Sequence, residues 1–107
     1  MKIALILTSN NAEKNWNALR LANLAITKGD IVSIFLLGEG VEYEINSSEK
    51  FNIKAQINTY LQSENASIQA CGTCMKSRNQ ETSETCPISG LAELYILVST
   101  FDKVLTF

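Results

Sequence analysis

The chain has 107 residues, 46% of them hydrophobic, with one proline and five glycines. This length suits one domain with one core, and the apolar content is too high for a disordered chain. The formal net charge is -2, from nine basic and eleven acidic residues spread along the sequence, so no basic stripe is available for nucleic acid. We therefore expect a single packed domain over residues 1–107, with no direct nucleic-acid partner.

The N-terminal residues predict a buried strand. Residues 3–7 read IALIL, an unbroken apolar run typical of a strand that is covered on both faces of a parallel sheet. The same run is too short for the apolar region of a signal peptide and far too short to cross a bilayer. We therefore expect a cytoplasmic protein without membrane association, whose three cysteines rest as thiols in a reducing compartment.

A helix is predicted to follow over residues 12–27. Its apolar side chains recur at helical spacing, at Trp16, Leu19, Ala22 and Ile26. Residues 9–11 are of types that cap helices, and Gly29 suits the position just beyond the helix end. A flavodoxin would cradle a phosphate in this loop, but residues 8–15 contain no glycine, so we expect a capping loop and no bound flavin.

The middle of the chain alternates again between strand and helix. Residues 30–38 are rich in β-branched and aromatic side chains and predict a second buried strand. Residues 39–50 are acidic and polar, and we expect an ordered loop with a solvated acidic face, a brief strand being the alternative. Apolar side chains at helical spacing predict a second helix over residues 51–64, and residues 67–70 predict a short strand leading directly into Cys71.

The C-terminal third predicts a polar loop, a helix and a last strand. The loop holds the only proline of the chain and a very short strand around residues 86–88. Ser89 is expected to cap a helix over residues 91–101, in which apolar side chains lie on nearly all sides. Such a helix needs more than one neighbour, so we expect it to pack on the sheet and on a partner subunit. Residues 103–107 predict the final strand.

The order of these elements predicts an α/β fold. Strands and helices alternate along the chain, which is the pattern of a mostly parallel sheet of about five strands with helices on both faces. In such sheets, ligands and reactive groups gather outside the carboxyl ends of the strands. Cys71 is predicted to lie at such an end, and there we expect the chemistry of the protein.

The segment CGTCMKSR, residues 71–78, carries the strongest chemical signal. If a helix begins after Cys71, then Cys71 and Cys74 lie one helical turn apart on the same side. The amide groups at the start of that helix, together with Lys76 and Arg78, would favour the thiolate of Cys71 and raise its nucleophilicity. The sequence therefore predicts a reactive thiol pair with two anion-stabilising cations.

Four interpretations of this segment stay open on residue chemistry alone. The two cysteines could pack as small buried residues at a strand–helix junction. They could belong to a metal site, but only Cys86 is left as a third sulfur ligand and the chain has no histidine, so we expect no metal. They could form a thioredoxin-like dithiol, with Cys86 as a resolving thiol for either. Finally, one cysteine could carry a sulfane sulfur as a persulfide and pass it to a partner.

Three stretches of the chain together resemble the DsrE/DsrF-like family. They are the N-terminal KIALILTS, the central ACGTCMKSR and the C-terminal LAEL and FDKVLTF. The family includes small sulfurtransferase subunits of sulfur oxidation and of the tRNA 2-thiouridine sulfur relay. The resemblance covers nearly the whole chain, and it implies a flavodoxin-like three-layer fold without flavin and assembly into homotrimers, hexamers or hetero-oligomers.

The resemblance also implies roles for individual residues. Cys71 corresponds to the cysteine that carries persulfide sulfur in the relay members, and Arg78 corresponds to a basic residue that follows it. Cys74 corresponds to an additional cysteine of the smaller members. Asn79 stands where a glycine is common, and asparagine also tolerates a left-handed backbone conformation.

One main hypothesis and two alternatives follow. The main hypothesis is a cytoplasmic sulfur-relay protein, in which Cys71 accepts sulfane sulfur from a donor protein and delivers it to an acceptor protein. Lys76 and Arg78 would stabilise the anionic sulfur, and Cys74 would assist release through a transient disulfide. The alternatives are a non-catalytic oligomeric or partner-binding module and a dithiol redox sensor, so whether the protein is an enzyme stays open. None of the three requires a cofactor.

Overall fold

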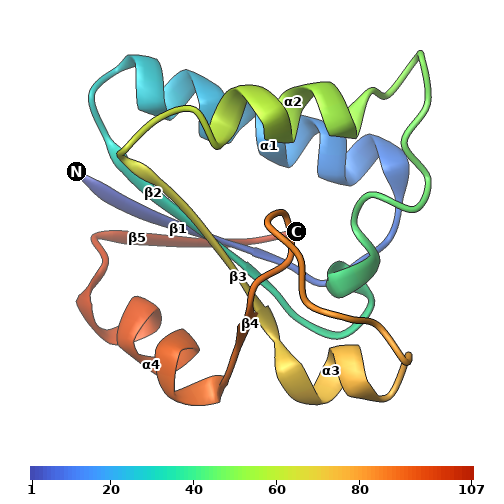
Figure 1. Ribbon diagram of the computed structural model, residues 1–107. Coiled ribbons are helices and arrows are strands. Elements are labelled where there is room, and N and C mark those ends of the chain that lie inside the picture. The colour runs from blue at the N-terminus through green and yellow to red at the C-terminus, as the bar shows by residue number, and fades with distance from the viewer.

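A computed structural model describes all residues from 1 to 107 (Figure 1). Five strands, all parallel, form one sheet in the order β4-β3-β2-β1-β5. The strands are β1 (Lys2–Leu7), β2 (Ile31–Leu36), β3 (Ala66–Cys71), β4 (Ile88–Ser89) and β5 (Lys103–Thr106). The helices are α1 (Ala12–Thr27), the short 3-10 helix η1 (Gly38–Glu42), α2 (Ile53–Tyr60), α3 (Gly72–Lys76) and α4 (Leu91–Thr100). The predicted parallel α/β sheet is confirmed.

The helices cover the two faces of the sheet unequally. In Figure 1, α1 and α2 lie side by side on one face, and α4 lies alone on the other. The chain moves outward from β1 through β2 and β3 to β4, then returns to the opposite edge to form β5. Because crossovers between parallel strands are right-handed, this reversal places α4 on the face opposite α1 and α2. The flavodoxin-like three-layer arrangement is therefore confirmed. The layer formed by α4 alone is the thin layer of the fold.

The hydrophobic core lies mainly between the sheet and the layer of α1 and α2. A cluster of 18 buried residues fills this side of the sheet. The cluster on the α4 side has only four buried residues, which are Ala4, Phe35, Cys71 and Leu97. Because successive strand residues point to opposite faces, Ala70 belongs to the larger cluster and Cys71 to the smaller one. The thin layer therefore forms the surroundings of Cys71.

The first helix matches its prediction closely. The side chain of Asn11 caps it by accepting a hydrogen bond from the backbone N–H of Lys14 at 3.0 Å. Gly29 follows the helix with a φ of 89°, a left-handed conformation that glycine adopts without steric cost. The partly buried Trp16 packs against Phe51, with ring centroids 5.4 Å apart, and so joins α1 to the chain that enters α2.

The second helix is shorter than the predicted range of residues 51–64. It begins after Asn52, whose side chain accepts a hydrogen bond from the backbone N–H of Ala55. It ends at Tyr60, whose hydroxyl lies within hydrogen-bonding distance of the backbone oxygens of Val32, at 2.9 Å, and Ser67, at 2.7 Å. These bonds fix the last turn of α2 to the sheet, so the chain must turn there to enter β3.

The acidic segment after β2 forms η1 and a series of turns, so the predicted ordered loop is confirmed and the alternative strand is wrong. Gly40 is required at its position in η1, because a Cβ there would lie 1.7 Å from the backbone oxygen of Leu7. The backbone N–H of Leu37 also donates to this oxygen, at 2.9 Å. The chain after β2 is thus held tightly against the carboxyl end of β1.

The last helix is apolar on nearly all sides, as predicted, but only one side of it packs on the sheet. Its inward side chains are Leu94, Leu97 and Phe101, which pack in the smaller cluster. Its exposed apolar side chains are Leu91, Tyr95, Ile96 and Val98, with exposed fractions of 65%, 72%, 54% and 51%. The cap residue is Gly90 and not Ser89, because Ser89 pairs with Cys71 in the sheet. None of the helices combines the length and the apolar content that a membrane crossing requires.

Candidate functional site

The CxxC segment lies where the carboxyl ends of β2 and β3 meet. Cys71 is the last residue of β3 and the cap residue of α3, and Cys74 lies one turn further along α3. Strand β2 is parallel to β3 and pairs with it up to Leu36 and Ala70, so the chain that leaves β2 passes beside the cysteines. That chain is η1, which begins at Gly38. Two segments from neighbouring strands therefore build the site together.

Cys71 is a buried residue. Only 5% of its surface is exposed, and it packs with Phe35 and Leu97 in the cluster beneath α4. Its side chain makes no capping hydrogen bond to α3, which has only five residues. The predicted stabilisation of the Cys71 thiolate by the amide groups at the start of a helix thus has no hydrogen bond to support it. A helix of five residues also sums few peptide dipoles.

Cys74 is more accessible and has a polar partner. Its side chain is partly buried and packs against both hydrophobic clusters. The backbone N–H of Gly38 donates a hydrogen bond to its Sγ at 3.2 Å. Cys71, one helical turn away, belongs to the smaller of these clusters, and its thiol acts on the pKa of Cys74. The structure therefore brings the predicted pair together and adds a backbone donor to one member.

The surroundings of Cys74 act on its acidity in both directions. Burial raises the pKa of the Cys74 thiol, and the neighbouring Cys71 thiol raises it further. The Gly38 N–H and the positive charge of Arg78 lower the pKa, but they do not outweigh the first two effects. At neutral pH the thiol form therefore predominates, and the Gly38 and Arg78 groups act on whatever negative charge develops at this sulfur.

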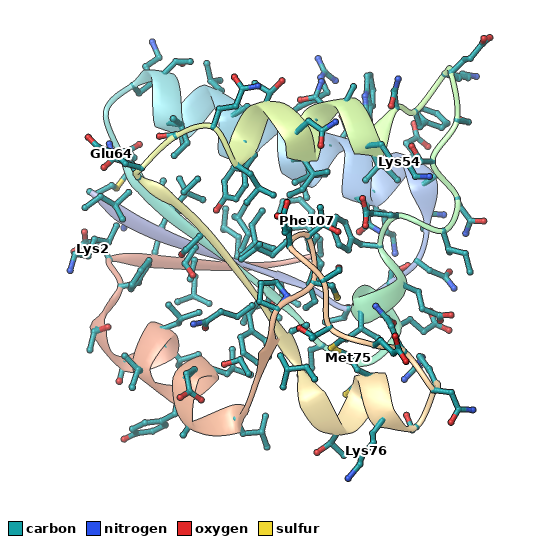
Figure 2. The ribbon with its side chains drawn as sticks, viewed as in Figure 1. Lys2, Lys54, Glu64, Met75, Lys76 and Phe107 are labelled. Atoms are coloured by element: carbon teal, nitrogen blue, oxygen red, sulfur yellow. The ribbon has the colours of Figure 1, made fainter.

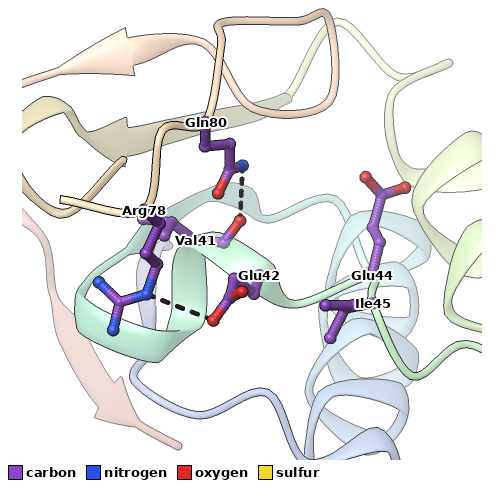
Figure 3. Close-up of a pocket in the computed structure, with 6 residues that line it drawn as sticks. All are labelled: Val41, Glu42, Glu44, Ile45, Arg78 and Gln80. Atoms are coloured by element: carbon purple, nitrogen blue, oxygen red, sulfur yellow. Dashed lines mark hydrogen bonds and ion pairs between the residues drawn. The ribbon is translucent and has the colours of Figure 1, made fainter. Parts of the chain in front are cut away.

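Arg78 joins α3 to η1, as Figure 3 shows. Its Nε lies 3.3 Å from Oε1 of Glu42, and its Nη1 donates to the backbone oxygen of Cys74 at 3.1 Å. The predicted cation therefore lies beside the cysteine segment. Part of its charge is balanced by Glu42, a residue that no sequence pattern singled out.

Lys76, the other predicted cation, lies on the side of α3 opposite to Arg78. In Figure 2 its amine points away from the sheet into solvent, and it takes part in neither of the two ion pairs of the chain. It lines a shallow cavity of about 380 Å³ between α3 and β4. Anion stabilisation by Lys76 stays a prediction, and the geometry favours Arg78 for this role.

A polar cavity of about 340 Å³ opens beside the pair of Arg78 and Glu42 (Figure 3). The residues that line it are Val41, Glu42, Glu44, Ile45, Arg78 and Gln80. The side-chain amide of Gln80 donates to the backbone oxygen of Val41 at 2.9 Å and links the loop after α3 to η1. None of the three thiols lines this cavity.

Cys86 lies in the predicted polar loop but is itself buried, with 3% of its surface exposed. Its Sγ lies 3.2 Å from Nε2 of Gln80 and 3.6 Å from the backbone oxygen of Val41. Burial raises the pKa of this thiol to about 11, with a smaller contribution from the charge of Glu44. A resolving role for Cys86 stays a prediction. No group of three or more His, Cys, Asp or Glu side chains could hold a metal ion.

Gly38 is the functional group that the sequence patterns missed. Its φ of 58° lies in the left-handed region, and its N–H is directed at Cys74. Residues 30–38 predicted a strand that ends on glycine, and parallel strands have their carboxyl ends at one edge. That signal places Gly38 near Cys71, but it cannot say which backbone group meets which sulfur.

Comparisons with known proteins agree with this fold. The family model of the DsrE/DsrF-like family matches residues 1–107. Uncharacterized protein MJ0989 of Methanocaldococcus jannaschii is 31% identical over 115 residues, covering 100% of both chains. The crystal structure of the ychN protein from E. coli matches with a TM-score of 0.81 and 26% identity, again over 100% of both chains.

Proposed function

Because this chain belongs to the DsrE/DsrF-like family, we propose that it is a sulfur-relay protein carrying sulfane sulfur as a persulfide on the pair of Cys71 and Cys74. Family membership suggests sulfur relay in general, and the arrangement of the thiols supports the more specific proposal. The donor and the acceptor are other proteins, and the chain acts in the cytoplasm.

The observation that carries this proposal is the pairing of two thiols with a backbone hydrogen-bond donor at the carboxyl edge of the sheet. Cys71 and Cys74 lie one helical turn apart, Cys74 packs against the cluster that holds Cys71, and the Gly38 N–H donates to Cys74. A sulfur that must repeatedly gain and lose negative charge is stabilised by a fixed N–H donor. A purely structural cysteine pair has no need of one.

The chemistry of the proposal is exchange between sulfur atoms. A cysteine thiolate attacks the outer sulfur of a donor persulfide, so a new S–S bond forms and the S–S bond of the donor breaks. The donor thiolate leaves with the electron pair and takes up a proton. The sulfane sulfur keeps its oxidation state, so loading consumes no external oxidant or reductant. Delivery repeats the exchange with a thiolate of the acceptor protein.

A second route of release would use both cysteines. The free thiol attacks the inner sulfur of the persulfide, hydrogen sulfide leaves, and a disulfide joins Cys71 to Cys74. The two thiols supply the two electrons that reduce sulfane sulfur to sulfide. A dithiol reductant, such as a reduced thioredoxin-type protein, must then reopen the disulfide.

Loading of sulfur onto the pair is testable by intact-mass measurement. The reduced protein treated with glutathione persulfide is expected to gain about 32 Da, one sulfur atom. The double variant Cys71→Ser and Cys74→Ser is expected to lose this adduct. The control variant Cys86→Ser, which removes the thiol outside the pair, is expected to keep it. If the mass of the wild-type protein does not change on exposure to glutathione persulfide, the carrier function is wrong.

The position of the two thiols, one helical turn apart, also favours a dithiol redox sensor as a second candidate. A sensor would close the disulfide under dilute hydrogen peroxide and lose about 2 Da, the mass of two hydrogens. It would take up no sulfur from glutathione persulfide. The two treatments, followed by the same mass measurement, therefore separate the candidates.

We further propose that the chain works as a homo-oligomer, a trimer or a hexamer. Four large apolar side chains of α4 are exposed, at Leu91, Tyr95, Ile96 and Val98. They cover one side of the thin layer, and neighbouring apolar side chains of this kind are typical of surfaces that contact another protein. A related alternative is a non-catalytic module that uses this surface for partner binding while its thiols have no chemical role.

Charging the exposed surface of α4 is expected to dissociate the oligomer. Burying carboxylates in a subunit interface carries a large desolvation cost, so the double variant Leu91→Glu and Tyr95→Glu should shift the mass from light scattering to that of the 11.8 kDa monomer. Lys54→Glu changes an exposed residue of α2 and is expected to leave the mass unchanged. A wild-type mass of 11.8 kDa would show the homo-oligomer to be wrong.

A further inference from the structure

The two thiols of the pair differ in exposure, and this difference bears on which of them meets the sulfur donor. Cys71 is 5% exposed and packs with Leu97 and Phe35. Exchange at sulfur requires the nucleophile to approach the donor in line with its S–S bond. The burial of Cys71 against Leu97 of α4 therefore hinders the approach of a donor with two sulfur atoms and a substituent.

Cys74 is the more accessible of the two thiols. Its side chain is partly exposed and packs against both hydrophobic clusters. It is also the thiol with a fixed donor, the Gly38 N–H at 3.2 Å. Arg78, bonded to the backbone oxygen of the same residue, adds positive charge on this side.

The Gly38 donor is held rigidly in place. Gly38 has a φ of 58°, and the chain on both sides of it lies against the end of β1. The N–H of Leu37 donates to the backbone oxygen of Leu7, and Gly40 approaches that same oxygen too closely for any side chain. A donor fixed in this way needs no reorganisation when charge develops on the sulfur, which is what makes such groups effective.

We propose that Cys74 is the cysteine that loads and delivers sulfur, and that the backbone N–H of Gly38 stabilises negative charge on its Sγ; this rests on the proposed carrier function. In loading, the Cys74 thiolate attacks the outer sulfur of the donor persulfide and the donor thiolate leaves with the electron pair and takes up a proton. In delivery, the acceptor thiolate attacks the outer sulfur, the bond from that sulfur to Sγ breaks, and Sγ leaves as a thiolate. Cys71 is the buried second thiol, available only for closing the disulfide.

The hydrogen bond from the Gly38 N–H should accelerate the delivery of sulfur more than its loading. Stabilising the thiolate enlarges its population but lowers its intrinsic nucleophilicity, so the two effects partly cancel in loading. In delivery, Sγ is the leaving group and negative charge grows on it, so the N–H promotes the step without an opposing effect. The role of Gly38 is therefore best measured as a rate of sulfur release.

Single variants test the assignment of the loading cysteine. With glutathione persulfide as the probe, Cys71→Ser is expected to gain one sulfur at a rate within about twofold of wild type, and Cys74→Ser to be slower by about a hundredfold or more. If Cys74→Ser gains sulfur at the wild-type rate and Cys71→Ser does not gain it, Cys74 is not the loading cysteine. The proposed carrier function would be unaffected by that result. Absence of the adduct from both the wild-type protein and Cys71→Ser, which cannot close the disulfide, would overturn both.

Replacing the backbone amide of Gly38 by an ester tests the role of its N–H as a hydrogen-bond donor to Cys74. In chemically ligated Cys71→Ser protein this change removes the N–H and weakens the Leu37 carbonyl as an acceptor for the Gly40 N–H, and we expect release of sulfur to 2-mercaptoethanol to slow by about tenfold. An ester at Gly29, whose N–H donates to the backbone oxygen of Ile26, is the matched control and should leave release unchanged. Circular dichroism confirms folding of both proteins. Equal release rates in the two would show that the Gly38 N–H has no part in the transfer.

Discussion

Gly40→Ala is expected to destabilise the protein by several kcal/mol, on the order of 4 kcal/mol, which is at the upper end for a single substitution. The new Cβ would lie 1.7 Å from the backbone oxygen of Leu7 and 2.5 Å from its carbonyl carbon. Backbone atoms cannot move aside as a flexible side chain can, so η1 must lift away from β1. Urea unfolding followed by circular dichroism measures the loss.

A matched glycine separates this clash from the general cost of losing a glycine. Gly38→Ala meets no atom within 4 Å, although its φ of 58° makes alanine unfavourable by about 1 kcal/mol. The Gly40 variant should therefore lose several times more stability than the Gly38 variant. Equal losses for the two would show that η1 is not packed against the end of β1 as described. Because η1 carries the Gly38 N–H, the Gly40 variant should also weaken the hydrogen bond to Cys74.

Stability is expected to fall steeply in alkaline solution. The pKa of Cys86 is raised from 9.0 to about 11 in the folded protein, first by burial and then by Glu44. A thiol with a raised folded pKa stabilises the fold fully below its unfolded pKa and loses that contribution as pH rises through the folded pKa. The loss from Cys86 is expected to reach about 2 kcal/mol by pH 11, since one pKa unit corresponds to about 1.4 kcal/mol.

Cys86→Ala isolates this contribution from the other alkaline groups. The pKa values of Cys74, Tyr43 and Tyr60 are also raised, chiefly by burial, so they destabilise the fold in the same direction. The variant should be less stable than wild type at pH 7, because it leaves a cavity, but its stability should fall less between pH 9 and pH 11. Parallel curves of unfolding free energy against pH would contradict the buried position of the thiol.

Much of this fold is predictable from local pattern. The apolar runs that form β1 and β2, the helical spacing of α1 and the left-handed Gly29 depend on neighbouring residues alone, and the structure follows them. Asn79, predicted to tolerate the left-handed region, has a φ of 52°. The position of the cysteine segment is also predictable, because a parallel sheet places the carboxyl ends of its strands at one edge.

The contacts within the site are not predictable in the same way. Burial of Cys71 depends on which face of the sheet α4 covers, and that follows from the return of the chain to β5. The bond from Gly38 to Cys74 joins residues 36 positions apart, and the pairing of Glu42 with Arg78 spans the same distance. Helical spacing in α4 marked apolar positions correctly, but it could not say which of them face the sheet and which face solvent.

The burial of Cys71 under a single helix gives the protein an internal reporter of its own motion. Helix α4 is held to the sheet through Leu94, Leu97 and Phe101, and no second helix supports it on that face. An element with so little cover opens locally at a lower free energy than the core on the other side of the sheet. In a reduced protein, the protection of Cys71 from a bulky thiol reagent therefore measures how often α4 lifts, and any subunit that docks on α4 must lengthen that protection.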